Sequence, residues 1–206
     1  LAELCRITVV ADFRSRDIAA GGQGAPLVPA FHAAGFGAST EHRVILNLGG
    51  IANITSLPVA GPPIGFDTGP ANLLMDLWAG KHRGVGYDDN GAWAAGGQVQ
   101  PQLLEAMLQH DYFAKPPPKS TGRDDFNERW LETFHPERTA PQDVQATLLA
   151  LTANSIGEAV ACHCPTATAV FACGGGVRNG ALMRAIGLQL HGRTLASTDE
   201  LGIHPD

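Results

Sequence analysis

Three glycine-rich turns are the parts of this sequence that point most directly to chemistry. Each follows a run of residues with strand character, and the three comprise Gly49 and Gly50, then Gly69, then Gly174, Gly175 and Gly176. Glycine lets backbone amides come close to a phosphate or a flat base, and ligands of open α/β sheets bind beyond the carboxyl ends of the strands. A single glycine after a strand is usually ordinary turn chemistry. Three such turns in one lobe together indicate a nucleotide.

The two commonest nucleotide signatures do not account for these turns. A P-loop requires G-x4-G-K-[ST], and Lys119-Ser120-Thr121 lacks both the glycines and a preceding strand. A dinucleotide fingerprint requires G-x-G-x-x-G, which residues 174–180 match only when the rule is relaxed. The sequence therefore favours a nucleotide site of another architecture.

The elements that must position these turns alternate between strand and helix. Apolar runs predict strands at residues 7–11, 43–48, 51–57, 64–67, 167–172 and 193–196. Helices are predicted at residues 71–78, 102–112, 124–134 and 143–162, and one more runs through 182 and 183 to 188. Residues 43–57 form a hairpin around its two glycines, and the segments 12–24 and 115–122 are loops. The predicted fold class is therefore α/β, with a mixed sheet and flanking helices.

Composition and charge narrow the class of partner. The 206 residues suffice for one large domain, or for a domain and part of another. With 14 Lys and Arg against 20 Asp and Glu, the net charge of −6 does not attract nucleic-acid phosphates or anionic lipid. No apolar run approaches the roughly 20 residues that span a bilayer, and the first residues lack the features of a signal peptide. We expect a cytoplasmic protein with small-molecule partners, no nucleic acid and no membrane, and a homodimer as one form it can take.

The cysteines and one histidine are expected to be structural. The four cysteines, at positions 5, 162, 164 and 173, are too irregularly spaced for a disulfide framework, so we expect them to be reduced and buried. Cys162-His163-Cys164 lacks the usual C-x2-C pairing, and no resident metal is predicted. His32 lies in an apolar segment and is expected to pack in the core.

Six segments of the chain, taken together, resemble the anhydro-N-acetylmuramic acid kinase family. They are residues 10–17, 21–29, 47–53, 65–72, 119–123 and 173–176, and they follow the order of the family along almost the whole chain. The combination is specific, although each piece alone is not.

The resemblance implies an actin-like ATPase fold, which is ribonuclease H-like, with ATP and sugar in a cleft between two lobes. Residues 1–17 would then be a remnant of the first lobe and the crossover, and residues 18–206 the second, nucleotide-facing lobe, truncated at its C-terminus. The family's N-terminal phosphate loop and a C-terminal acidic segment are not in this sequence. We therefore expect a fragment that lacks both ends, holds half of the cleft and is inactive alone.

The resemblance also implies the cofactor and its contacts. The hairpin would be the second phosphate-binding element, and residues 174–176 the adenosine-binding turn. The ATP contacts would be Gly49, Gly50, Asn53, Gly69, Gly174, Gly175 and Gly176, and Mg²⁺ would be held mainly by the nucleotide phosphates.

The implied reaction is hydrolytic opening of the 1,6-anhydro ring of anhydro-N-acetylmuramic acid with phosphorylation of O6, which gives N-acetylmuramic acid 6-phosphate in peptidoglycan recycling. Asp67 matches the catalytic base, and its alternative role is to cap the following helix. Arg14, Arg16 and Asp17 match substrate contacts, a task suited to the arginine fork, and their alternative is a solvated loop.

Two further points stay open at this level. Lys119 and Arg123 could approach phosphate or belong to a rigid surface loop. A non-catalytic, nucleotide-switched module of the actin or Hsp70 kind is the alternative function, although such proteins do not need the Asp-Phe-Arg-x-Arg-Asp pattern at residues 12–17.

Overall fold

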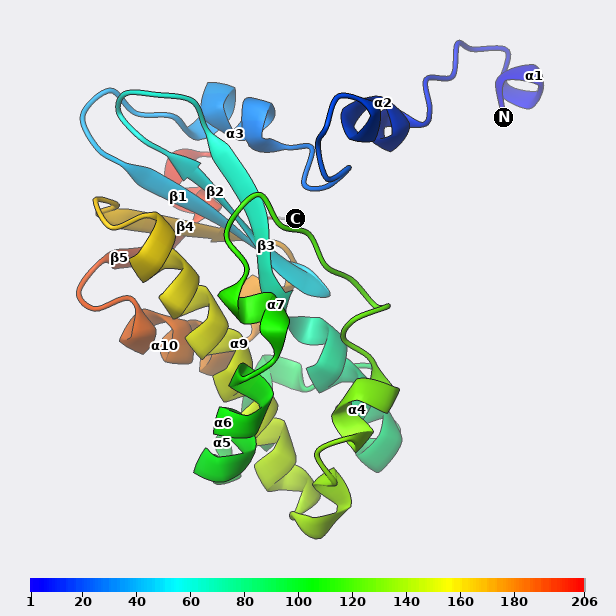
Figure 1. Cartoon of the computed structure of the whole chain (residues 1–206), viewed down its shortest axis with the longest axis vertical. Coiled ribbons are helices and arrows are strands. Elements are labelled where there is room, and N and C mark those ends of the chain that lie inside the picture. The colour runs from blue at the N-terminus through cyan, green and yellow to red at the C-terminus, as the bar shows by residue number, and fades with distance from the viewer. Residues whose placement is uncertain (206) are drawn as a thin grey trace.

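Fifteen helices and strands make up residues 1–205, the part of the chain that the computed structural model describes (Figure 1). In chain order they are α1 (Ala2–Cys5), α2 (Phe13–Ala19), α3 (Pro29–Phe36), β1 (Arg43–Leu48), β2 (Ile51–Leu57), β3 (Ile64–Pro70), α4 (Asn72–Arg83), α5 (Ala92–Ala95), α6 (Pro101–Leu108), α7 (Asp111–Ala114), α8 (Glu128–Glu132), α9 (Pro141–His163), β4 (Ala169–Cys173), α10 (Gly180–Gln189) and β5 (Thr194–Ser197). Short 3-10 turns join some of them, and the turn η3 (Gly175–Arg178) follows β4.

The strands form one mixed sheet in the order β3-β2-β1-β4-β5. Strand β2 is antiparallel to both β1 and β3, and β4 is parallel to β1 and β5. This is the strand order of a ribonuclease H-like lobe, so the predicted mixed sheet with flanking helices is confirmed. Because β1, β3 and β4 run in the same direction, their carboxyl ends meet at one edge.

The two faces of the sheet are covered differently. Helix α9 lies along one face (Figure 1), where residues such as Leu148, Leu151 and Ile156 pack against α4, α10 and the strands in the main core. It begins with a proline at its first turn and ends just before Cys164-Pro165, because proline cannot continue a helix. The other face carries a smaller cluster, in which Phe36 of α3 packs with Ile45, Leu57 and Phe171.

Two predictions for the N-terminal part of the chain are wrong. Residues 7–11 form no strand, since a strand needs a neighbour for its backbone hydrogen bonds and none of the five strands lies beside them. Residues 13–19, predicted as loop, form helix α2, and the glycine-rich turn begins only after it. Neither α1 nor α2 buries a residue, and Figure 1 shows both extending away from the sheet. The domain boundary at residue 17 stays a prediction.

Helix lengths also differ from the sequence pattern. The predicted helix 102–112 is two helices, because the side chain of His110 accepts a hydrogen bond from the amide of Tyr112 and starts α7. The predicted helix 124–134 shrinks to α8, which Asn127 caps by accepting from the amide of Trp130. Helix α4 runs five residues beyond its predicted end, to a left-handed glycine, Gly84, with φ of 66°.

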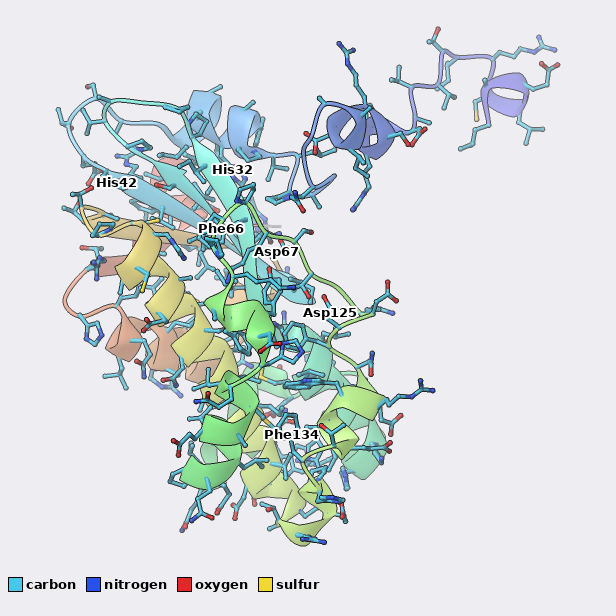
Figure 2. The ribbon with its side chains drawn as sticks, viewed as in Figure 1. His32, His42, Phe66, Asp67, Asp125 and Phe134 are labelled. Carbon is cyan, nitrogen blue, oxygen red and sulfur yellow. The ribbon has the colours of Figure 1, made fainter. Side chains whose placement is uncertain are left out.

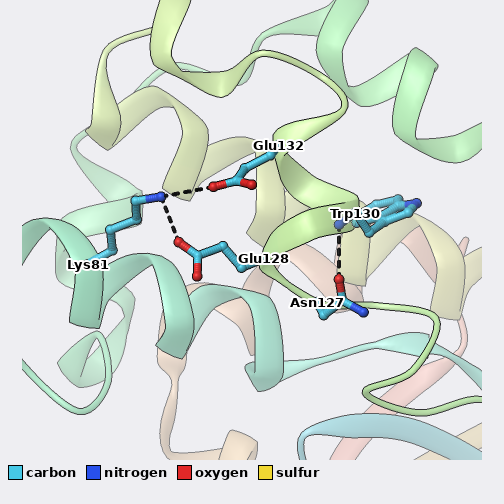
Figure 3. Close-up of polar contacts among 5 residues, drawn as sticks. All are labelled: Lys81, Asn127, Glu128, Trp130 and Glu132. Atoms are coloured by element: carbon cyan, nitrogen blue, oxygen red, sulfur yellow. Dashed lines mark hydrogen bonds and ion pairs between the residues drawn. The ribbon is translucent and has the colours of Figure 1, made fainter.

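An exposed ion-pair network ties α8 to α4 (Figure 3). The Lys81 ammonium lies 2.7 Å from the carboxylate of Glu128 and 3.5 Å from that of Glu132. Because all three side chains are largely exposed, screening by water keeps their contribution to stability small. The network marks where the surfaces of α8 and α4 meet.

The cysteine prediction is half right. All four are free thiols, but Cys5 and Cys162 are exposed, because α1 buries nothing and Cys162 lies on the outer side of α9. Only Cys164 is buried, and Cys173 is intermediate. No helix within residues 1–205 combines the length and the apolar character needed to cross a membrane.

Candidate active site

A row of polar residues crosses the sheet near its carboxyl edge. Asp67 on β3 lies opposite Asn53 on β2, Asn53 opposite Asn47 on β1, and Asn47 opposite Cys173 on β4. Residues directly opposite each other point to the same face of a sheet, so all four share one face. The row continues the face that α3 covers, because Ile45 lies two residues before Asn47 and belongs to the α3 cluster.

The row also shows unusual backbone and unmet polar atoms. The pairing of β2 with β3 shifts register between Ala52 and Asn53, a bulge of the kind that re-aims side chains next to active sites. The Oδ1 atom of Asn53 is buried and has no hydrogen-bond partner within residues 1–205. A buried acceptor without a partner is unfavourable, and a bound ligand or water would satisfy it.

Asp67 is the most constrained member of the row. Its Oδ2 atom accepts hydrogen bonds from the Ser120 hydroxyl and the Thr121 amide, both at 2.9 Å, while Oδ1 accepts none from residues 1–205. The side chain is buried, and burial raises the pKa of this carboxyl, while the bonds from Thr121 and Ser120 and the charge of Arg14 oppose the rise. Figure 2 shows Asp67 on β3, with the loop after α7 passing beside it. One oxygen is fixed, and the other remains available as a proton acceptor.

The alternative role of Asp67 as a helix cap is wrong. Helix α4 begins at Asn72, its capping position is Ala71, and no side chain caps it. The backbone of Asp67 is instead held in an extended edge, where its amide donates to the carbonyl of Lys119 at 3.1 Å and its carbonyl accepts from the Tyr112 hydroxyl at 2.7 Å. The carboxyl therefore has no capping function to explain its burial.

The three predicted substrate contacts lie on α2 and are not equivalent. The side chains of Arg14 and Arg16 are exposed and make no hydrogen bond or ion pair within residues 1–205, and the charge of Arg14 acts on Asp67. Asp17 accepts from the amide of Gly24 at 2.7 Å, so it fixes the turn that follows the helix. The two guanidinium groups are free to bind an anion, whereas one oxygen of Asp17 already has a structural role. Contact with substrate stays a prediction for all three.

The hairpin turn is attached to the start of α4. The amide of Asn72 donates to the carbonyl of Gly49 at 3.1 Å, and the amides of Ala71 and Leu73 donate to that of Gly50. The Asn72 side chain donates to the carbonyls of Leu48 and Gly49 as well. Within residues 1–205 the hydrogen bonds of the turn use these carbonyls, and none uses the amide hydrogens of its two glycines. Those amides are suited to an anion such as phosphate.

The three glycines after β4 differ in whether packing leaves room for a side chain. Gly174 has φ of 83°, and a Cβ there would lie 2.5 Å from Oδ1 of Asn47. A Cβ on Gly176 would lie 2.6 Å from the Cβ of Leu48. Gly175 is different, because a Cβ there would meet nothing within 4 Å. Packing therefore requires Gly174 and Gly176, and Gly175 is the one that faces open space.

Gly69 is also explained by packing. Its φ is 151°, and a Cβ would lie 2.7 Å from a ring carbon of Phe113 in α7. The close approach of β3 to α7 therefore requires a glycine here. Contact of Gly69 with ATP stays a prediction.

A cavity of about 310 Å³ adjoins the Gly175 turn, a size at the lower end of small-molecule sites. It is lined by Asn72, Met75 and Asp76 of α4, by residues 87–90 of the loop that follows, and by Gly175, Arg178 and Asn179. Since Asn72 also contacts the hairpin turn, the cavity and the turn are neighbours.

Sequence reasoning missed several of these residues. Asn47 is a polar residue inside an apolar strand, and its place two residues before the glycine pair was a signal for it. Asp76 follows Asn72 by four residues on one helix, which places both on one side of α4. Neither signal identifies a ligand without the register of the sheet or the position of η3.

Contacts bear on two other predictions. The interpretation of Lys119 as part of a surface loop is wrong, because its buried ammonium donates to the carbonyls of Tyr112 and Phe113, both at 3.2 Å, in the last turn of α7. Its approach to phosphate stays a prediction. Arg123, which follows in the same loop, is exposed. His32 is buried with its ring nitrogen 2.9 Å from the hydroxyl of Thr55, which confirms that it packs in the core.

Comparisons with known proteins point to one family. The sequence model of anhydro-N-acetylmuramic acid kinase matches residues 1–206. Proteins of that name are 55% identical over 98% of this chain in Chromobacterium violaceum, 54% identical over all of it in Nitrosomonas europaea and 55% identical over all of it in Burkholderia cenocepacia. The chain spans 56%, 57% and 56% of these relatives.

Among solved structures, an activator of 2-hydroxyisocaproyl-CoA dehydratase from Clostridium difficile with bound ADPNP aligns with a TM-score of 0.47. It is 16% identical, and the alignment covers 76% of this chain and 54% of the activator. A likeness this weak carries no argument about function. The match to the family and the relatives is sufficient without it, and the chain belongs to the anhydro-N-acetylmuramic acid kinase family.

Proposed function

We propose that the full-length protein containing this chain is an ATP-dependent kinase that opens the 1,6-anhydro ring of anhydro-N-acetylmuramic acid and phosphorylates O6. The product is N-acetylmuramic acid 6-phosphate, an intermediate in peptidoglycan recycling. The observation that carries the proposal is Asp67, a buried carboxyl with a raised pKa and one free oxygen at the carboxyl edge of the sheet. The relatives bear the name of this activity.

Asp67 acts as the base in this proposal. Its free Oδ1 takes a proton from water as the water oxygen bonds to C1 of the sugar, and the bond between C1 and O6 breaks. The electron pair released on O6 attacks the γ-phosphorus of ATP, and ADP leaves. Glycosidases usually need a second carboxyl group to protonate the leaving oxygen. Here phosphorus captures that oxygen, so a single base is enough.

The nucleotide is assigned to the carboxyl edge between the hairpin and η3. The free amides of the Gly49-Gly50 turn would bind phosphate, and the cavity beside Gly175 would hold the nucleoside. Mg²⁺ would enter with ATP, held mainly by phosphate oxygens, and would offset the negative charge of the triphosphate. Arg14 and Arg16 would bind the lactyl carboxylate of the sugar. Because ATP is a co-substrate, we assign the reaction to the cytoplasm, where ATP is made.

A non-catalytic nucleotide switch is the competing function. It would use the same nucleotide pocket but has no need for a buried carboxyl beside exposed arginines. The Asp67 environment and the Arg14 charge acting on it therefore favour the kinase.

Replacing Asp67 with asparagine in the full-length protein tests the proposal. Asp67→Asn keeps the shape and can still accept the bonds from Ser120 and Thr121, but an amide cannot take a proton. General-base roles typically contribute about 10²–10⁴-fold in rate, so ring opening and phosphorylation should fall together by that factor. Mass spectrometry of the products measures both.

Asp124→Asn is the matched control, because it removes the same charge from an exposed position of the neighbouring loop. Thermal melting confirms that each variant folds. Near-normal turnover by a folded Asp67→Asn protein would remove Asp67 from the catalytic residues.

A further inference from the structure

Asp76 is a carboxyl group whose surroundings neither the fold nor the proposed reaction explains. It projects from the middle of α4 and lines the cavity beside Gly175. It is only partly exposed, and it makes no hydrogen bond or ion pair within residues 1–205. A partly buried carboxylate without a protein donor is less favourable than a paired one, and its position in the wall of a ligand-sized cavity suits it to accept hydrogen bonds from a ligand.

The neighbouring acids make the position less favourable still. Burial and the nearby Asp88 raise the pKa of Asp76 to about 6. Asp88 has a structural role, since its two oxygens accept from the amides of Trp93 and Ala94, both at 2.9 Å, and so organise the start of α5. Asp89 and Arg178 complete the charged residues at the cavity wall. Among these acids, Asp76 is the one whose burial has no structural explanation.

The position of Asp76 along α4 identifies the part of the ligand that it faces. Asn72, at the start of α4, contacts the hairpin turn that the proposed function assigns to phosphate. Asp76 lies four residues later, about 6 Å farther along the helix axis. The group next to the phosphate chain in a nucleotide is the ribose, and the base follows it. Across the cavity, Gly175 provides open space for the nucleoside.

We infer that Asp76 binds the ribose hydroxyls of the nucleotide and makes this site selective for ribonucleotides. The two oxygens of a carboxylate match the two neighbouring hydroxyl groups of a ribose, which are both donors. This inference rests on the proposed function, because it requires the nucleotide to occupy the cavity beside Gly175.

Titration calorimetry on the full-length protein tests the inference with ATP, 2′-deoxy-ATP and 3′-deoxy-ATP. A hydrogen bond to a charged group is worth enough that loss of one hydroxyl should weaken binding about tenfold or more. In Asp76→Asn, ATP should bind more weakly, and the preference for ATP over the deoxy forms should fall to about twofold or less. Asp124→Asn removes the same charge from an exposed position outside the cavity and should keep the preference.

Purine riboside triphosphate separates the ribose from the base, because it keeps both hydroxyls and lacks the amino group of adenine. It should lose affinity in Asp76→Asn as ATP does. Equal binding of ATP and both deoxy forms by the unaltered protein, or a preference unchanged in Asp76→Asn, would overturn the inference and leave the kinase proposal standing. Failure of the unaltered protein to bind ATP at all would overturn both.

Discussion

At the scale of single residues, the hydrogen bonds to Asp67 set its proton affinity. Burial raises the pKa of this carboxyl, and the bond from Ser120 opposes the rise. Removing that bond in Ser120→Ala should therefore raise the pKa further. A base acts only when it is deprotonated, so the loss of kcat/KM on the acid side should move to higher pH, with little change at alkaline pH. A pH profile of kcat/KM for the full-length protein measures the shift.

Thr121→Val is the control for Ser120→Ala. The Thr121 hydroxyl donates to Asp125 at 2.6 Å, and its backbone amide, which the substitution keeps, is the group that donates to Asp67. The acid limb of Thr121→Val should stay in place. An acid limb that moves equally in both variants, or in neither, would show that Ser120 does not tune the base.

Only the site residues that lie within a family motif could be predicted from the sequence. Asp67 and Asn53 were expected from the resemblance, and the structure places them opposite each other on β3 and β2. Asn47 and Cys173 complete the same row, but they are distant in sequence, and their alignment depends on the parallel register of β1 and β4. The role inferred for Asp76 depends on the lack of a hydrogen-bond donor to its side chain within residues 1–205, and a sequence pattern cannot show that.

At the scale of elements, the turn after β4 combines structural and ligand-facing glycines. Gly175→Val should fold, because its φ lies outside the left-handed region and a Cβ there would meet no neighbouring atom within 4 Å. The added bulk fills space that the nucleoside needs, and overpacking of this kind should weaken ATP binding about tenfold or more. Calorimetry in the full-length protein measures the affinity, with thermal melting as the folding check.

Two other glycines make the comparison specific. Gly176→Ala should be destabilising, because its Cβ would lie 2.6 Å from that of Leu48. Gly86→Val, which also enters open space and does not line the cavity, should leave affinity and fold unchanged. Unaltered ATP affinity in a folded Gly175→Val protein would mean that this turn does not bind the nucleoside.

Elements were predictable where local pattern and tertiary context agree. The hairpin and α9 match their predicted ranges closely, since alternation and helical spacing reflect the faces they bury. Residues 7–11 have the composition of a strand but no neighbouring strand to pair with. Strand propensity alone therefore gave a wrong prediction here. The helix predicted at 102–112 broke because His110 caps a new helix, a local bond that apolar spacing does not reveal.

At the scale of the whole molecule, the exposed apolar surface of the N-terminal residues and the length of the chain both fit one lobe of a larger protein. Leu4 and Val10 are 88% and 71% exposed, and α1 and α2 bury nothing. The chain spans about half the length of its relatives. Both observations fit the proposal that residues 1–17 belong with a first lobe, while the sheet and its helices form the nucleotide-facing lobe.

The 206-residue chain on its own should therefore bind ATP weakly at most and neither phosphorylate the anhydro-sugar nor hydrolyse ATP at a useful rate. Phosphoryl transfer depends on positioning the phosphates, the metal and the acceptor, and in the proposed two-lobed enzyme these contacts would come from both sides of the cleft. With one side, the triphosphate stays in water, where the free Oδ1 of Asp67 has no fixed sugar to act on. A coupled ADP-release assay with and without sugar measures this, and robust sugar-dependent turnover by the 206-residue chain would show that one lobe is enough.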